Sequence, residues 1–123
     1  MAEDRIPKKP LGDAAKLTKI LHALSAVIDE RAEGSSRTSY TAKLLEKGRV
    51  QVAKKLIEEG GELGLALVAQ EKEDIANVAA DLLYHFLVGL RSRGISLNQV
   101  AEALIAREGI SGLARDRGEK KGK

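Results

Sequence analysis

The chain has 123 residues, a formal net charge of +3 and no cysteine. This length suits a single domain with a modest hydrophobic core, and the lack of cysteine excludes disulfide bonds and thiolate-bound zinc or iron–sulfur centres. The opening residues MAEDRIPKKP lack the apolar stretch of a secretory signal, and no apolar run is long enough to span a membrane. We therefore expect a soluble, cytoplasmic protein without a membrane partner.

The N-terminal part of the chain predicts one long helix and one short helix. Apolar residues recur at helical spacing from Asp13, a plausible N-cap, to about Arg31. A polar loop, AEGSSRTSY (32–40), follows this helix. A short amphipathic segment at about 41–46 then ends near Gly48, because glycine commonly terminates helices.

Three further segments have helical patterning, at about 49–70, at about 72–92 and at 97–108, where Ser96 is the expected N-cap. The short connection between the first two of these segments predicts an antiparallel helical hairpin. No segment shows the sustained alternation of a β-strand. The predicted fold class is therefore all-α.

The C-terminal residues 109–123 differ in composition from the rest of the chain. This segment, GISGLARDRGEKKGK, holds five cations and two anions, and its balance of +3 equals that of the whole chain. We therefore expect residues 1–108 to form one neutral all-α domain and residues 109–123 to form a basic flexible tail. With two tyrosines, one phenylalanine and no tryptophan, the chain is too poor in aromatic residues for a nucleic-acid stacking surface.

Acidic residues fall on one flank of the predicted hairpin. The apolar stripe expected on the 49–70 helix consists of Val52, Leu56, Gly60, Leu63 and Leu67. Glu59 and Glu62 lie on one flank of this stripe, whereas Glu58 faces solvent. On the 72–92 helix, Asp81 is the single charged residue of NVAADLLYHFLVGL (77–90).

Antiparallel pairing would place Glu59 and Glu62 opposite Asp81 at the edge of the core. Three carboxylates converge only if a cation lies between them, and oxygen ligands favour Mg²⁺ or Mn²⁺. Each feature also has a simpler explanation: the glutamates can be a solvated face, and Asp81 can form an ion pair with Lys55. The pattern alone leaves these alternatives open.

Several ordered blocks of the sequence resemble the phosphoribosyl-ATP pyrophosphohydrolases, which are related to the MazG-like nucleoside triphosphate pyrophosphohydrolases. The resemblance extends from about Ser39 to Arg107. The blocks that carry it are SYTAKLL (39–45), Gly48, AKKLIEEGGEL (53–63), ADLLYHFLV (80–88) and RGISLNQV (93–100).

This resemblance implies a MazG-like bundle of four to five helices that forms dimers or higher oligomers. It also implies Mg²⁺-dependent hydrolysis of phosphoribosyl-ATP to phosphoribosyl-AMP and pyrophosphate, the second step of histidine biosynthesis. The expected partners are phosphoribosyl-ATP, or a related nucleotide, and further copies of the chain. No nucleic-acid partner is expected.

The metal signature of the family is ExxE followed by ExxD. The first pair maps onto Glu59 and Glu62, and the second pair should occupy positions 78 and 81. Asp81 is present, but Val78 stands where the family pattern has glutamate. The implied metal ligands are thus Glu59, Glu62 and Asp81, and Glu58 or Glu59 would accept a proton from the attacking water.

The resemblance also implies residues that bind the substrate. Its phosphates would be bound by Lys43, Lys54 and Lys55, and Ser39, Tyr40 and Thr41 would contact it from a loop. Tyr84 and His85 belong to the block ADLLYHFLV (80–88), which contains Asp81. They either support the site by packing or contact the substrate directly.

Val78 leaves three interpretations open. The remaining three carboxylates can suffice, because Mg²⁺ keeps several waters and takes ligands from substrate phosphates. Alternatively, Asp74, one turn earlier, compensates for the missing glutamate. In the third interpretation catalysis is weakened or lost, and the chain is a paralogue that binds nucleotides or mediates oligomerisation. A pyrophosphohydrolase for another nucleoside triphosphate is a further alternative, since fold does not determine substrate.

Overall fold

The computed structural model describes residues 5–108, which form five α-helices and no β-strand. The helices are α1 (Ala15–Ala32), α2 (Tyr40–Glu46), α3 (Arg49–Ala69), α4 (Lys72–Arg93) and α5 (Leu97–Glu108). The all-α prediction is confirmed, and the helices begin and end close to the expected residues. No helix within residues 5–108 is long and apolar enough to cross a membrane. The predicted tail, 109–123, lies outside the described residues.

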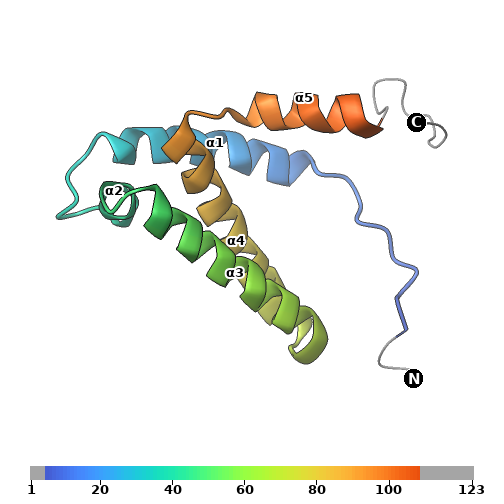
Figure 1. Cartoon of the computed structure of the whole chain (residues 1–123). Helices are drawn as coiled ribbons and strands as arrows, with labels where there is room; N and C mark the ends of the chain where they lie inside the picture. The colour runs from blue at the N-terminus through green and yellow to red at the C-terminus, as the bar shows by residue number, and fades with distance from the viewer. Residues whose placement is uncertain (1–4, 109–123) are drawn as a thin grey trace.

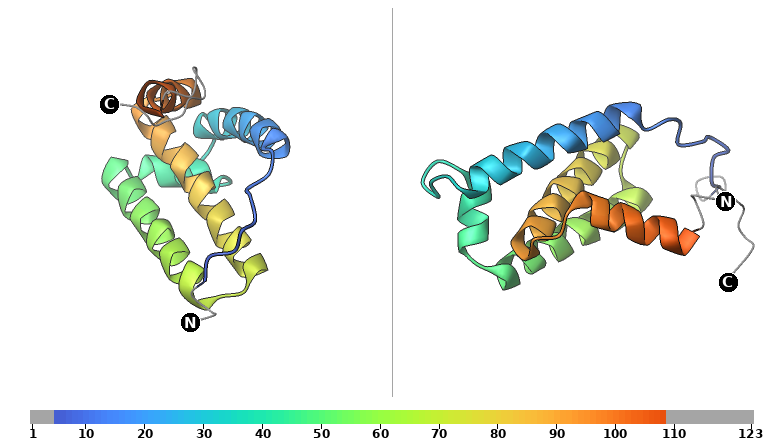
Figure 2. Two further views of the ribbon diagram at one scale, coloured as in Figure 1. Left: turned by 90° about the vertical axis from the view of Figure 1, so that its right-hand side faces the viewer. Right: turned by 90° about the horizontal axis from the view of Figure 1, so that it is seen from above.

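The α3–α4 hairpin is the longest unit of the fold. The two helices run side by side in opposite directions, joined by a short connection at 70–71 (Figure 1). The tip of the hairpin points away from α1, α2 and α5, which gather around its other end (Figure 2). The outer half of the hairpin is therefore covered mainly by its own two helices.

The hydrophobic core lies at the end of the hairpin where the other helices gather. Its buried members come from four helices: Ile28 of α1, Leu44 of α2, Val52 of α3, and Leu87 and Val88 of α4. Burial of each such side chain contributes about 1.5–3 kcal/mol relative to exposure. This core fixes α1 and α2 against the hairpin and so determines which hairpin residues stay uncovered.

The buried line of α3 differs from the predicted stripe. Residues at alternating intervals of four and three are buried or partly buried: Val52, Leu56, Glu59, Leu63 and Ala66. This spacing averages 3.5 residues, the period of a helix that packs along a partner helix as in a coiled coil. The prediction that Leu67 belongs to the stripe is wrong, because Leu67 is 64% exposed. The shorter period instead brings Glu59 into the buried line.

Of the two N-caps predicted from the sequence, Ser96 is confirmed and Asp13 is displaced by one residue. Ser96 caps α5: its Oγ accepts from the Gln99 N–H at 3.1 Å, and Gln99 Oε1 accepts from the Ser96 N–H at 2.9 Å. This reciprocal arrangement is a capping box. Asp13, predicted as the N-cap of the first helix, lies one residue before that position. Ala14 occupies the N-cap position, and Asp13 Oδ1 accepts from the Ala15 N–H at 3.0 Å.

Candidate active site

Glu59 is a buried carboxylate in the middle of α3. It is 5% exposed, and its Oε1 atom is buried without a hydrogen-bond partner. Its Oε2 atom lies 3.4 Å from Nζ of Lys55, one turn earlier. A buried carboxylate oxygen without a partner carries a large desolvation cost. Glu59 is therefore a candidate to bind a ligand, since a cation or a proton donor would satisfy this oxygen.

Lys55 links Glu59 to the more exposed Glu58. Its Nζ atom lies 3.6 Å from Oε1 of Glu58 as well as 3.4 Å from Glu59. The hydrogen bond to Glu59 is the main reason why the pKa of Lys55 is raised above its ordinary value. Lys55 thus stays protonated and holds the two candidate general bases side by side.

The register of the hairpin places Asp81 level with Glu62. A Cβ atom at Gly89 would lie 3.6 Å from Cδ2 of Leu56 and 4.0 Å from Cγ1 of Val52. Because the helices are antiparallel, moving eight residues toward the tip, from Gly89 on α4 and from the midpoint of its two contacts on α3, brings Asp81 level with Glu62. Of the predicted metal ligands, Glu62 and Asp81 therefore lie at corresponding heights of the hairpin.

Asp81 and Glu62, which were expected at the edge of the core, are both exposed. Leu82 and Leu83, which follow Asp81 in sequence, are partly buried, whereas the Asp81 side chain itself is exposed. Within residues 5–108, no three histidine, aspartate or glutamate side chains come close enough together to hold a metal ion. The metal site formed by Glu59, Glu62 and Asp81 therefore stays a prediction.

A hydrogen-bonded clasp joins α2 to α4 next to these carboxylates. His85 is buried, and its Nδ1 lies 2.8 Å from the backbone carbonyl oxygen of Asp81. Because a carbonyl only accepts, Nδ1 carries a hydrogen, and the other ring nitrogen, Nε2, lies 3.0 Å from the Tyr40 hydroxyl and hydrogen bonds with it. The His85 ring is thus held between the backbone of α4 and the Tyr40 hydroxyl.

The SYT block lies at the start of a helix rather than in a loop, contrary to prediction. Ser39 is the N-cap of α2, and its Oγ accepts from the Ala42 N–H at 3.1 Å. Thr41 is 1% exposed and hydrogen bonds with the Tyr84 hydroxyl. Both residues therefore hold α2 in place, and Tyr40, which is half-exposed, is the most exposed member of the block.

The predicted phosphate-binding lysines line one cavity between α2 and α3. It has a volume of about 260 Å³ and is lined by Lys43, Lys54 and Lys55 together with Tyr40 and Glu58. Lys47 and Gln51 also line it. Neither residue is among those predicted from the sequence. Lys47 is four residues after Lys43 and Gln51 is three residues before Lys54, and this helical spacing was an available signal.

The Tyr40→Phe variant is expected to test the clasp. Loss of the hydroxyl removes the bond to His85 and should lower the free energy of unfolding by about 1 kcal/mol at pH 7. Burial is the main cause that raises the pKa of Tyr40 above its ordinary value of 10.0. The folded state thus favours neutral tyrosine, so wild-type stability is retained below pH 10 and declines as the pH rises further.

Urea unfolding at several pH values measures both effects. Between pH 10 and 11 the variant should lose less stability than the wild type, because it has no phenol to ionise at this position. Equal losses in the two proteins would contradict the role assigned to Tyr40.

The fold and the site together define an all-α protein with a buried carboxylate beside a lysine-lined cavity, a combination suited to phosphorylated ligands. The chain belongs to the phosphoribosyl-ATP pyrophosphohydrolase family, whose model matches residues 21–108. The match begins within α1 and is therefore longer than the motif resemblance, which begins at about Ser39.

Relatives named phosphoribosyl-ATP pyrophosphatase match most of the chain. A phosphoribosyl-ATP pyrophosphatase of Caulobacter vibrioides is 48% identical over 99 residues, which cover 80% of this chain and 92% of the relative. Phosphoribosyl-ATP pyrophosphatase 1 of Bradyrhizobium diazoefficiens is 46% identical, covering 76% and 88%. Phosphoribosyl-ATP pyrophosphatase 1 of Rhodopseudomonas palustris is 44% identical, covering 76% and 87%.

Proposed function

We propose that this protein hydrolyses phosphoribosyl-ATP to phosphoribosyl-AMP and pyrophosphate, the second step of histidine biosynthesis, in the cytoplasm. Membership of the family and the names of its relatives support this function. The observation in the structure that supports it best is Glu59, a buried carboxylate with an unbonded oxygen beside a cavity lined by lysines.

Glu59 and the residues around it have separate roles in the proposed reaction. Glu59 or Glu58 accepts the proton of the attacking water, and Lys55 keeps both carboxylates in place through its ion pairs. Tyr40, held by His85, borders the same cavity and limits the positions open to a substrate. Lysine ammonium groups stabilise the charge on phosphate oxygens.

A divalent cation, Mg²⁺, fits the donor set of this site. The candidate ligands are the carboxylates of Glu59, Glu62 and Asp81, and the unbonded oxygen of Glu59 can accept such an ion. Mg²⁺ prefers oxygen ligands and usually combines one or two carboxylates with waters and substrate phosphates. When bound, the ion would neutralise charge on the phosphates during their hydrolysis.

The proposed function is tested by incubating the purified protein with phosphoribosyl-ATP and measuring pyrophosphate release, with Mg²⁺ and with excess EDTA. We expect release that depends on Mg²⁺ and is lost with EDTA. The Glu62→Ala variant serves as the reference for background hydrolysis. Release from the wild type that does not exceed this background would overturn the proposal.

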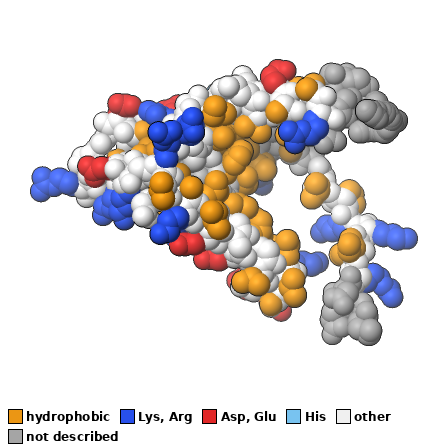
Figure 3. All heavy atoms as spheres, in the orientation of Figure 1, with side chains coloured by type: hydrophobic (Ala, Val, Ile, Leu, Met, Phe, Trp, Pro, Cys, Tyr) orange, Lys and Arg blue, Asp and Glu red, His pale blue; other side chains and the backbone are white. Residues whose placement is uncertain are grey.

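The protein also forms an oligomer in this proposal, through the outward face of α3. Ile57, Leu65 and Val68 of α3 are 73%, 73% and 88% exposed. Hydrophobic side chains extend along this helix to the tip of the hairpin (Figure 3). An apolar face of this kind on a helix that is already packed on its other side is typical of a surface that contacts another subunit.

The Val68→Glu variant is expected to shift the sedimenting species from an oligomer toward the monomer, because it places a charge within an apolar contact. Leu11→Glu is the matched control, since Leu11 is also fully exposed but precedes α1. A wild-type protein that sediments as a monomer at micromolar concentration would contradict the proposed oligomer.

A further inference from the structure

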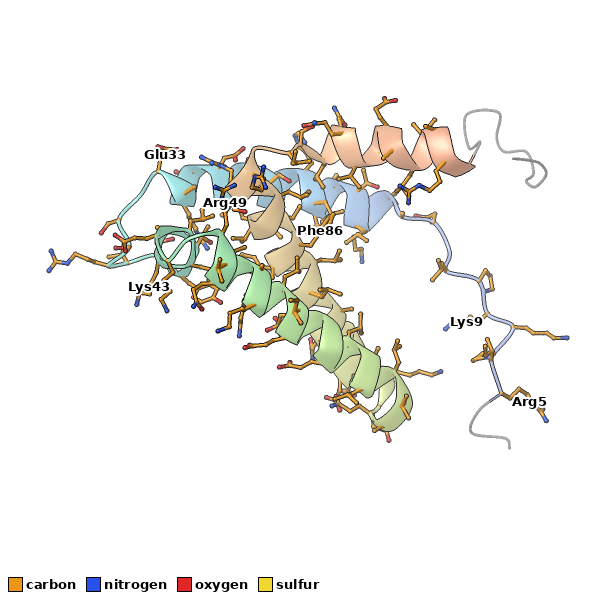
Figure 4. All side chains as sticks on the ribbon, viewed as in Figure 1. Arg5, Lys9, Glu33, Lys43, Arg49 and Phe86 are labelled. Atoms are coloured by element: carbon orange, nitrogen blue, oxygen red, sulfur yellow. The ribbon has the colours of Figure 1, made fainter. Side chains whose placement is uncertain are left out.

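The cavity between α2 and α3 carries more positive charge than the neighbouring carboxylates neutralise. Lys43 of α2, Lys47 just after α2, and Lys54 and Lys55 of α3 line it, and Glu58 is the one acidic residue of the lining. Figure 4 shows Lys43 on α2 next to the start of α3, and Figure 3 shows lysine and arginine side chains gathered over these two helices. The cavity therefore attracts anions.

Ion pairing separates Lys55 from the other three lysines. Lys55 lies within ion-pairing distance of Glu58 and Glu59. In the part of the chain that the structure describes, Lys43, Lys47 and Lys54 form no ion pair with a carboxylate. We call these three lysines, together with Gln51, the lysine pocket. Its charge is available for a ligand that brings its own negative charge.

The lysine pocket overlaps the carboxylates only in part, because Glu58 lines the same cavity whereas Glu59, Glu62 and Asp81 do not. Along α3, Gln51 precedes Glu62 by eleven residues, which corresponds to about 16 Å of helix. Lys55, Glu58 and Glu59 occupy the middle of this distance. The site therefore has a carboxylate end, suited to a cation with its bound phosphates, and a lysine end, suited to a phosphate without a metal ion.

Phosphoribosyl-ATP has two anionic groups that match these two ends. Its triphosphate is the group that is cut, and the phosphate monoester of its added ribose is attached on the other side of the adenine base. ATP lacks this monoester. Lysines that bind the monoester would therefore let the site distinguish phosphoribosyl-ATP from ATP.

We propose that the lysine pocket binds the 5′-phosphate monoester of the phosphoribosyl group and thereby selects phosphoribosyl-ATP over ATP. This inference rests on the proposed function. It assigns Lys47 and Gln51 to substrate recognition, and it assigns Lys43 and Lys54 to the monoester and not to the triphosphate. Gln51 supplies a neutral amide donor next to the charged lysines.

The Lys47→Met variant tests this assignment, because methionine keeps the unbranched stem and removes the charge. The preference for phosphoribosyl-ATP over ATP, measured as the ratio of the two kcat/KM values, should fall about tenfold to a hundredfold, mainly through a higher KM for phosphoribosyl-ATP. The Lys47→Arg variant should recover most of this preference. Lys72→Met, which removes an exposed charge at the start of α4, should keep the wild-type ratio.

Direct binding separates this inference from the proposed function. Ribose 5-phosphate, titrated calorimetrically into the wild type and the Lys47→Met variant, should bind more weakly to the variant by the same factor, and unphosphorylated ribose should bind neither protein. Ribose 5-phosphate that binds both proteins equally, or neither, would overturn the lysine pocket even if the wild type hydrolyses phosphoribosyl-ATP. Weaker binding by the variant would support the pocket even if hydrolysis were absent.

Discussion

Replacing Glu59 by glutamine is expected to lower kcat for phosphoribosyl-ATP hydrolysis by about a hundredfold or more. Loss of a general base typically costs a factor of 10²–10⁴, and Glu59 is in addition a candidate metal ligand. Glutamine has nearly the same volume, so the packing between α3 and α4 should persist. Pyrophosphate release at saturating Mg²⁺ and substrate measures the effect.

The same variant should keep or gain stability. Glu59 is buried and one of its oxygens has no partner, so removing its charge removes a desolvation cost. Lys55 retains Glu58 as an ion-pair partner. We therefore expect a Tm equal to or higher than that of the wild type, as is common where a functional site retains an unfavourable charge.

Glu102→Gln is the matched control, because Glu102 lies on the exposed surface of α5. It should change neither turnover nor Tm. If Glu59→Gln hydrolyses the substrate at the wild-type rate, Glu59 is not part of the catalytic machinery. A large drop in Tm would instead indicate that its carboxylate stabilises the fold.

The contrast between Ser96 and Glu59 shows what could be predicted from the sequence. The cap of α5 involves Ser96 and Gln99, three residues apart, so the local pattern contains all the information it needs. The burial of Glu59 depends on how α4 lies along α3. A free helix repeats every 3.6 residues, whereas the packed pair follows 3.5. This small difference puts Glu59 in the position expected for Gly60, and Ala66 in the position expected for Leu67.

The hydrogen bond between Tyr40 and His85 and the exposure of Asp81 could not be predicted from the sequence, for a related reason. Tyr40 and His85 meet across 45 positions of the chain, and a sequence pattern does not specify such a contact. Asp81 lies in an apolar segment, but its exposure depends on which helices cover that side of α4. The motifs therefore supplied candidate residues for the site, and the packing of the helices determined the burial and the contacts of these residues.

Introducing glutamate at position 78 is expected to raise hydrolysis. Val78 is partly buried on α4, one turn before Asp81, at the position where the family pattern has glutamate. A carboxylate here would stand on the same side of the helix as Asp81 and add an oxygen ligand for Mg²⁺. We expect kcat/KM for phosphoribosyl-ATP to rise about tenfold or more and half-maximal activity to require less Mg²⁺. Initial rates across a Mg²⁺ titration measure both quantities.

The size of this gain separates the three interpretations of Val78. Val78→Gln is the control, because it adds similar polar bulk without a charge and should not increase activity. If Val78→Glu gains nothing and Asp74→Asn is also silent, then Glu59, Glu62 and Asp81 suffice. If only Asp74→Asn loses activity, Asp74 compensates for the missing glutamate. If the wild type is barely active and Val78→Glu gains a large activity, the natural site is weakened by the missing carboxylate. One added carboxylate can restore hydrolysis only where the other catalytic residues are still in place.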